Sequence, residues 1–254
     1  MKTVSKNRFL EMAQCYHETA PFTVPQYDWL QDQALDLIAS DSRTEHAYFV
    51  DVGGGSGRMV KKYLKRFPDS KACIVDSSDA FLELAAQFLS KEKARVDFIQ
   101  SPIEENWENE LIEQPTTVFS MSCIHHLLPE EKQTVYQKCG DILMDGGLFM
   151  NVDEMIRTTE ESFFTHLQFW WEHGLAQKDV IPDHLRDSYE RFMEFFYRWK
   201  VRNIDQRDQP KQKGDDLYQT VTEQLEMLKN VDLKRVDSYF SFRVWNAIAG
   251  RKSI

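Results

Sequence analysis

The run FVDVGGGSGRM at residues 49–59 decides the fold of this chain. An apolar stretch closes on Asp51 and Val52, a glycine cluster follows, and a helical pattern begins near Ser56. This order predicts a buried parallel strand, a tight turn and a helix N-terminus that faces a ligand. Glycine permits positive φ angles and lets a ligand lie against bare backbone. Asp51 is therefore placed to accept hydrogen bonds from a ligand ammonium group or from N–H groups of the loop.

Strand and helix patterns alternate from residue 47 to residue 153. Each short apolar run of strand length is followed by a polar connection or by a segment with helical periodicity. Such regular alternation predicts βαβ units, and therefore a parallel sheet with helices on both faces. The predicted elements are strands 47–52, 72–75, 96–99, 117–122 and 148–152, with helices 56–67, 79–89 and 130–143.

The segments on either side of this core have a different pattern. Helical periodicity dominates both, and residues 155–207 contain no strand pattern. The sequence therefore predicts a helical cover, an inserted helical cap and a closing pair of strands. The predicted segments are a helix over 5–20 that breaks at Pro21 and Pro25, helices 27–39, 160–176 and 182–202, a polar connection at 210–214, a helix over 216–229, and strands 234–242 and 244–250.

We expect a single domain over residues 1–254, with a cover at 1–42 and a cap at 155–210. A chain of 254 residues suits one domain with an elaboration, and 42% apolar residues suffice for a sizeable core. Uninterrupted apolar runs stay shorter than a membrane span. The N-terminal residues lack the apolar segment of a signal peptide. These features predict a cytoplasmic protein without a membrane partner.

Charge and cysteine content narrow the function further. The formal net charge is −10, whereas nucleic-acid binders usually present a basic face, so no nucleic acid is expected as a partner. The basic cluster within residues 58–66 is interpreted as the solvated face of one helix. Four widely spaced cysteines, Cys15, Cys73, Cys123 and Cys139, include no C-x-x-C pair. They predict reduced thiols in the core and no metal site.

The glycine spacing separates two classes of ligand. A dinucleotide needs the pattern G-x-G-x-x-G, but Arg58 stands where the third glycine would fall. Asp51, just before the loop, suits a ligand with an amino-acid moiety and a sulfonium better than a pyrophosphate. Asp76 ends the second predicted strand, where it could accept both hydroxyl groups of a ribose. The alternative role of Asp76 is to cap the helix that begins near Ser78.

Five motifs follow one another along the chain: the loop 51–57, the acid Asp76, and the segments 118–127, 145–153 and 228–250. Together they resemble the class I S-adenosylmethionine-dependent methyltransferases. The resemblance implies a Rossmann-like α/β fold with a doubly wound, mostly parallel seven-stranded sheet and an antiparallel C-terminal strand. It also implies S-adenosyl-L-methionine as cofactor and S-adenosyl-L-homocysteine as product. The implied activity is methyl transfer to oxygen or nitrogen of a small, partly apolar metabolite.

The resemblance also implies which residues hold the cofactor. Asp51, Gly53 and Gly55 would hold its amino-acid end, and Asp76 with Ser77 its ribose. Further contacts would come from the end of the fourth strand and from an N-terminal helix that covers the cofactor in many relatives. The residues expected there are Ser122 and Tyr16, with Tyr27 as a second candidate and core packing as the alternative role of Tyr16.

The adenine site departs from the family pattern. Many relatives carry an aspartate after the third strand that accepts the exocyclic amine of adenine, and Pro102 stands at that place here. We therefore expect backbone groups, Gln100 or Ser101 and the apolar side chain of Ile103 to hold the adenine.

His125 and His126 are the candidate catalytic residues. Both follow the fourth predicted strand, at the edge of the sheet where an acceptor would meet the methyl group. Histidine can take a proton near neutral pH, which a hydroxyl or ammonium acceptor requires. The alternative is that both histidines only pack or cap at the entry of the next helix. His17, His166 and His173 are weaker candidates on segments expected to cover the site.

The predicted cap carries two aromatic stripes, residues 163–175 and 185–199. Such stripes usually pack against each other and the sheet, but here they could also line the acceptor site or form a homodimer surface. Three rival functions remain open at this point. These are another reaction of S-adenosylmethionine, a non-catalytic binding or interaction protein, and, more distantly, NAD-dependent oxidoreduction.

Overall fold

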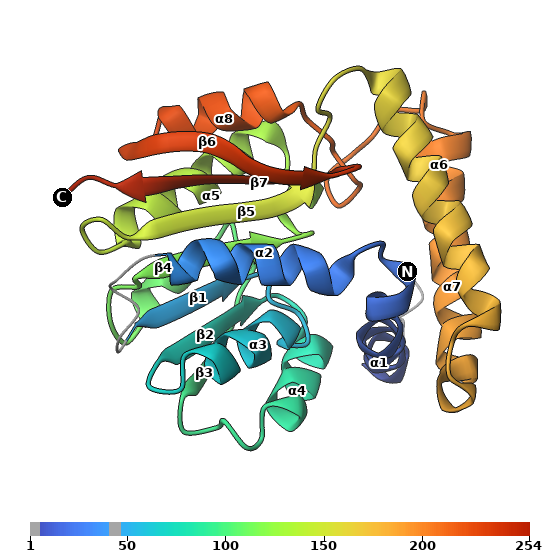
Figure 1. The fold of residues 1–254 in the computed structure, drawn as a ribbon, viewed down its shortest axis with the longest axis horizontal. Coiled ribbons are helices and arrows are strands. Elements are labelled where there is room, and N and C mark those ends of the chain that lie inside the picture. The colour runs from blue at the N-terminus through green and yellow to red at the C-terminus, as the bar shows by residue number, and fades with distance from the viewer. Residues whose placement is uncertain (1–5, 41–46) are drawn as a thin grey trace.

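A seven-stranded sheet forms the centre of the computed structural model, which describes residues 6–40 and 47–254 (Figure 1). The strands are β1 (Tyr48–Val52), β2 (Lys71–Asp76), β3 (Val96–Gln100), β4 (Thr117–Met121), β5 (Leu148–Glu154), β6 (Leu233–Phe242) and β7 (Trp245–Lys252). Their order in the sheet is β3-β2-β1-β4-β5-β7-β6. β7 pairs antiparallel with β5 and β6, and the remaining pairs are parallel. The predicted fold class is confirmed.

The strand order reverses between β1 and β4. The chain winds outward from β1 to β3, returns to β4 on the other side of β1, and then winds outward again. Open sheets of this kind bind ligands beyond the carboxyl ends of the strands, at the point where the order reverses. The glycine loop leaves β1 at this point, so the topology places it where a ligand is expected.

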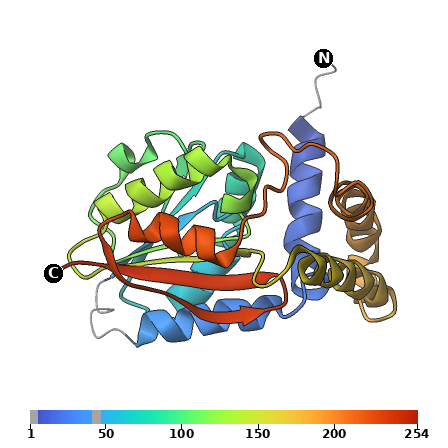
Figure 2. The same ribbon diagram turned by 90° about the horizontal axis from the view of Figure 1, so that it is seen from above.

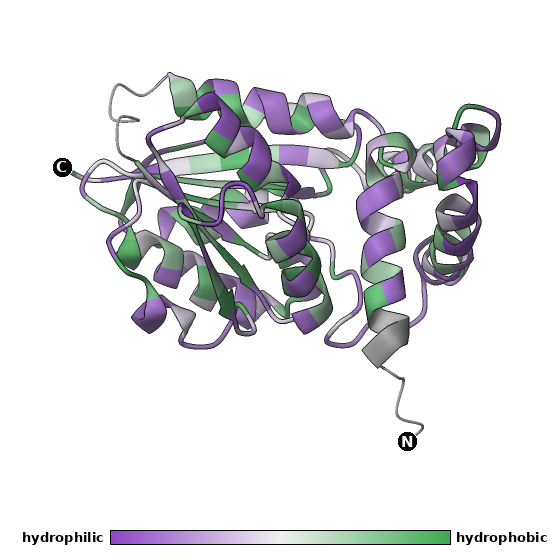
Figure 3. Cartoon of the chain, turned by 90° about the horizontal axis from the view of Figure 1, so that it is seen from below, coloured by the Kyte–Doolittle hydropathy of each residue, from purple (hydrophilic) through white to green (hydrophobic). Residues whose placement is uncertain are grey.

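Helices cover both faces of the sheet (Figure 2). On one face lie α2 (Tyr27–Ala39), α3 (Arg58–Arg66) and α4 (Asp79–Phe88), and on the other lie α5 (Pro129–Ile142) and α8 (Val221–Lys229). In Figure 3 the strands are mainly green, whereas the surrounding helices alternate between green and purple. This is the pattern of amphipathic helices packed on a buried sheet. In the described residues, none of these helices combines the length and apolar character needed to cross a bilayer.

α1 (Lys6–Thr23) continues through Pro21, where the sequence analysis predicted a break. Proline has no N–H, so the carbonyl oxygen of His17, four residues earlier, loses its helical donor. Arg58 at the start of α3 replaces that donor: its Nε lies 2.8 Å from this oxygen, and its Nη2 donates to it as well. The predicted break at Pro21 is therefore wrong, because Arg58, the residue after the glycine loop, supplies the donor that the helix lacks.

The cap consists of α6 (Glu160–Ala176) and α7 (Arg186–Lys200), joined by the short turns η3 (Gln177–Asp179) and η4 (Asp183–Leu185). Both helices contact α1, and the three stand together beyond one end of the sheet (Figures 1 and 2). Trp170 Nε1 donates to the carbonyl oxygen of Thr23 at 3.1 Å. His173 Nε2 lies 2.9 Å from the carbonyl oxygen of Phe22. These contacts satisfy carbonyl groups that the last turn of α1 leaves free.

The helix predicted over residues 216–229 begins later, at Val221. Thr220 caps its N-terminus, and Glu223 reaches back to the Thr220 N–H, which forms a capping box. The preceding residues instead lie against the segment after β4, with Leu217 donating to the His125 carbonyl oxygen at 2.8 Å. This corrects the prediction: Asp216 is in a non-helical segment that crosses the carboxyl end of the sheet.

Candidate functional site

The glycine loop turns sharply at the end of β1. Gly53 has a φ of 72° and donates to the Val75 carbonyl oxygen at 2.7 Å. A Cβ atom at Gly53 would lie only 2.1 Å from Cys123 Sγ. Position 53 therefore demands glycine for two reasons, its backbone conformation and the close approach of the segment after β4.

A cavity of about 400 Å³ lies against this loop. It opens beyond the carboxyl ends of β1, β2 and β4, with α1 and α2 on its far side. The structure brings most of the sequence-predicted residues together there. Those that line the cavity are Tyr16, Asp51, Gly53, Gly55, Asp76, Ser77, Ser122 and His126.

Two acids give the cavity its electrostatic character. Asp51 is 2% exposed, and burial, followed by the charge of Asp76, raises its pKa to about 8. Burial also raises the pKa of Asp76, although its carboxylate accepts hydrogen bonds from the Gly55 and Ser78 N–H groups, both at 2.9 Å. A buried acid with a raised pKa gains from a cationic partner. The cavity thus favours a ligand that brings an ammonium group to Asp51.

The residues predicted for adenine lie elsewhere. Ser101 and Ile103 are buried beside the cavity-lining strands without lining the cavity, and Pro102 is not among its lining residues either. The Ser101 N–H donates to the Asp76 carbonyl oxygen at 3.1 Å, so this segment supports the end of β2 from behind. The adenine contacts of these three residues stay a prediction.

Sequence reasoning missed several residues of the cavity. Gln31 and Phe81 line it from α2 and α4, and Tyr27, weighed as a second candidate, lines it too. Arg58 was assigned to a solvated helix face, but it lines the cavity and holds His17. No local signal in the sequence could have shown this, because the carbonyl group that Arg58 binds lies 41 positions away.

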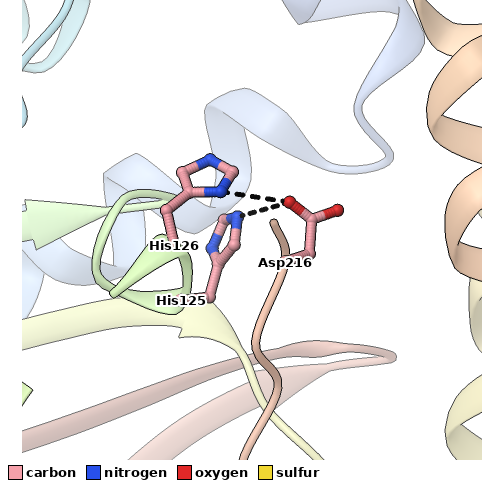
Figure 4. Close-up of side chains that lie close together, drawn as sticks. All are labelled: His125, His126 and Asp216. Carbon is pink, nitrogen blue, oxygen red and sulfur yellow. Dashed lines mark ion pairs between the residues drawn. The ribbon is translucent and has the colours of Figure 1, made fainter. Parts of the chain in front are cut away.

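His126 stands at the edge of the cavity and is paired with Asp216 (Figure 4). Its Nδ1 lies 3.1 Å from Asp216 Oδ1, and its second ring nitrogen points away from this carboxylate. The neighbouring rings of His125 and His126 hold the pKa of the buried Asp216 well below its usual range, against the effect of burial. A carboxylate that accepts from Nδ1 fixes the ring tautomer in which Nε2 can accept a proton.

His125 has a different environment. It is buried, its Nδ1 lies 2.6 Å from Asp153 and 2.7 Å from Glu154, and its Nε2 lies 3.6 Å from Asp216. Burial alone would lower its pKa, but Glu154 and Asp153 outweigh it and hold the pKa well above the usual value. His125 is therefore an imidazolium that neutralises buried acids. An imidazolium cannot accept a proton, so the geometry disfavours His125 as a base.

The other histidines considered from sequence do not line the cavity. His17 Nδ1 bonds Ser56 Oγ at 2.8 Å, and burial, together with the charge of Arg58, lowers its pKa to about 4. His173 bonds the end of α1, and His166 lies on α6 near Arg243. His17 thus joins the cover to the glycine loop, and His173 joins the cap to the cover.

Three of these atoms could also surround a metal ion. His125 Nε2, His126 Nδ1 and Asp216 Oδ1 lie within 4.8 Å of one another, and His125 Nδ1 faces carboxylates as metal-bound histidines often do. The same atoms already have partners without an ion, since His126 Nδ1 lies 3.1 Å from Asp216 Oδ1 and the His125 imidazolium supplies positive charge. The group is therefore a direct His126–Asp216 contact beside a buried cluster of His125, Asp153 and Glu154.

The chain is similar to known methyltransferases in part of its sequence and in its fold. Residues 49–147 match the family model described as methyltransferase domain. The malonyl-[acyl-carrier protein] O-methyltransferase of Halalkalibacterium halodurans is 30% identical over 105 residues, which are 41% of this chain and 38% of that protein. The matched region thus spans well under half of that relative.

Solved structures share the fold at low sequence identity. Human N-acetylserotonin methyltransferase, solved in complex with SAM, is 12% identical with a TM-score of 0.60, over 98% of this chain and 57% of that one. An O-methyltransferase family protein from Burkholderia thailandensis is 13% identical with a TM-score of 0.57, over 93% and 63%. Residues 49–147 therefore match a methyltransferase domain, and the chain shares its fold with S-adenosylmethionine-dependent methyltransferases.

Proposed function

We propose that this protein transfers a methyl group from S-adenosylmethionine to an oxygen or nitrogen atom of a small, partly apolar molecule. The observation that carries the proposal is the pairing of His126 with Asp216 at the edge of a cavity that also contains Asp51 and Asp76. Asp51 and Asp76 would bind the cofactor, and His126, paired with Asp216, would take the proton of the acceptor.

The cavity residues fit the groups of the cofactor. Asp51 would pair with the ammonium group, which would restore the ionised state that burial disfavours. Asp76 keeps lone pairs for ribose hydroxyls, because a carboxylate can accept about four hydrogen bonds and two are in use. When bound, S-adenosylmethionine supplies a methyl group on a sulfonium, which needs no activation by the protein.

The chain's own residues would then act on the acceptor. His126 Nε2 takes the proton of the acceptor hydroxyl or amine as the acceptor forms its bond to the methyl carbon. The cofactor held by Asp51 and Asp76 would supply the methyl group and keep the electron pair of the carbon–sulfur bond as a neutral thioether. Asp216 holds the ring through Nδ1 and stabilises the imidazolium that results. Tyr16 and Met121 supply apolar surface that excludes water from the cavity.

An oxygen acceptor is the better supported of the two alternatives. The curated relative from Halalkalibacterium halodurans is named an O-methyltransferase, as is the protein from Burkholderia thailandensis. A hydroxyl group also needs a base more than a neutral amine does, and the His126–Asp216 pair offers one.

The test is transfer of label from methyl-labelled S-adenosylmethionine to a panel of small hydroxylated and amine compounds, followed by mass spectrometry. The proposal expects a labelled product that depends on His126. Consumption of the cofactor without a labelled acceptor would favour another reaction of S-adenosylmethionine. Tight binding without turnover across the panel would favour a binding protein.

Domain organisation, location and assembly complete the proposal. We propose that residues 1–254 act as one domain in which the cover and cap close the cavity. All four cysteines are free, as is usual in a reducing compartment, which supports a cytoplasmic location. The cap buries much of its aromatic surface within the chain but exposes Leu175, Val180 and Tyr197, where a homodimer could form. Light scattering of the purified protein tests this assembly.

A further inference from the structure

Asn203 is a buried polar residue at the end of an apolar helix face. Along α7, Phe192, Phe196 and Trp199 point into the protein, and Asn203 takes the next inward position, 2% exposed. The helix widens there into the π-turn η5 (Val201–Asp205), in which the Gln206 N–H donates to the Val201 carbonyl oxygen at 2.9 Å. Such turns are rare and frequently occur at functional sites.

Its neighbours fix the direction of the Asn203 carboxamide. Nδ2 donates to Asp216 Oδ2 at 2.7 Å, and Oδ1 accepts from Lys211 Nζ at 2.8 Å. A lysine can only donate and a carboxylate can only accept, so the amide has one orientation that satisfies both. Nδ2 also donates to the Trp199 carbonyl oxygen at 3.1 Å, which ties the side chain to its own helix.

The two oxygens of Asp216 therefore have separate partners. Oδ1 faces His126 at 3.1 Å and His125 at 3.6 Å, whereas Oδ2 accepts from Asn203 and, at 3.1 Å, from the Tyr218 hydroxyl group. Rotation of the carboxylate would break both bonds to Oδ2. Asp216 has no helix of its own to restrain it, so these outside contacts set its direction.

We infer that Asn203 is a positioning residue of the methyl-transfer site, through which the helical cap holds Asp216 in line with His126. The inference rests on the proposed function for its catalytic meaning, but its geometry stands on the contacts above. Through Asn203, a displacement of α7 would turn Asp216 and release the ring of His126. The cap would thus control the base as well as cover the cavity.

The direct test is a histidine side-chain ¹⁵N–¹H spectrum of the full chain without cofactor, with His126 assigned from His126→Ala. Asn203→Asp keeps the size of the side chain and an acceptor for Lys211, but places an acceptor against Asp216. We expect the His126 ring signals to move by at least half of the change that Asp216→Asn produces. Gln206→Leu, just beyond the π-turn, should leave them in place. Unchanged His126 signals in a folded Asn203→Asp protein would overturn the inference.

Asn203→Ala provides a second variant, because it removes the donor without adding a charge, and the same shift of the His126 signals is expected. Once an acceptor is known, kinetics separate positioning from general destabilisation. Asn203→Asp should lower kcat about tenfold or more with little change in cofactor KM, and it should have no further effect in a His126→Ala background. If Asn203→Asp keeps full activity while His126→Ala is inactive, the positioning role of Asn203 is rejected and the role of His126 as the base is retained. Full activity of His126→Ala would reject His126 as the base. The spectra would still show whether Asn203 holds Asp216 against the His126 ring.

Discussion

Arg58, the first residue of α3, donates to the carbonyl oxygen of His17, which Pro21 leaves without a partner inside α1. The residue that follows the glycine loop therefore holds the helix that covers the cavity. Ser56 adds a hydrogen bond to the His17 ring at 2.8 Å. Cofactor binding and the position of α1 are expected to depend on each other, because both involve the same loop.

Replacement of Arg58 by methionine should loosen α1 and weaken cofactor binding. The variant loses charge-assisted hydrogen bonds worth about 1.5–3 kcal/mol, which corresponds to a roughly tenfold to hundredfold loss of affinity if α1 must be in place. Hydrogen exchange should rise in α1, and calorimetry gives the affinity. Lys61→Met is the matched control, since Lys61 bonds Phe88 instead. Pro21→Ala in the Arg58→Met protein should partly restore protection, and a failure of Arg58→Met to change α1 exchange would contradict the account.

His126→Ala should abolish most of the methyl transfer without loss of cofactor. A positioned base contributes about 10²–10⁴ to the rate, so kcat should fall by that factor. The affinity for S-adenosylhomocysteine should stay within about twofold, because His126 is only at the edge of the cavity. The exposed His184 serves as control, and His184→Ala should behave as wild type. A His126→Ala enzyme with normal kcat would remove the base from the mechanism.

His125→Gln should lower the free energy of unfolding of the protein, beyond any effect on its activity. The variant leaves Asp153, Glu154 and Asp216 without their central cation, and breaking a buried ion pair typically costs about 3–5 kcal/mol. The pKa of His125 is raised in the folded state, so its contribution is fully present below pH 6.5 and is lost as pH rises through the folded pKa. Urea unfolding of the wild type and the variant should show that their difference in free energy of unfolding becomes smaller at alkaline pH. A difference in free energy of unfolding that increases with pH would contradict the role of His125 as a stabilising cation.

Much of the fold could be predicted because its signals are local. The alternation of apolar runs and helical patterns gave the sheet, and the glycine run gave the turn after β1. The start of α8 was missed although Thr220 and Glu223 form a capping-box pattern in the sequence. The stripe of α7 continues by helical spacing to Asn203, and this polar residue on an apolar face was the available signal for the contact with Asp216.

The remaining features depend on contacts between distant segments. Arg58 follows the loop directly, but its partner is a carbonyl group in α1 that is exposed by a proline. Asp216 meets His126 only because residues 214–217 pack across the end of β4. Periodicity and spacing describe one segment at a time, and they cannot show which two segments will meet at the site.

Asp51→Asn should stabilise the protein without cofactor. The folded state raises the pKa of Asp51 to about 8, so folded chains keep a proton that unfolded chains have lost. The stability of the wild-type protein therefore falls as pH rises from about 4 to 8. The asparagine variant has no ionisable group at this position, so its stability does not fall for this reason. Thermal or urea unfolding at pH 8 should show a gain on the order of 2 kcal/mol, with a smaller gain at pH 5. A destabilised variant at pH 8 would mean that Asp51 has a structural partner.

The most direct measurement of the central claim is calorimetry of S-adenosylmethionine binding at pH 6.5, in two buffers of different ionisation enthalpy. At this pH the cavity keeps Asp51 largely protonated, and an incoming ammonium group should displace the proton. The account predicts that the wild-type protein releases close to one proton on binding. It predicts that Asp51→Asn releases none and binds about a hundredfold more weakly. Equal affinity and equal proton release in the two proteins would contradict the placement of the cofactor at the glycine loop.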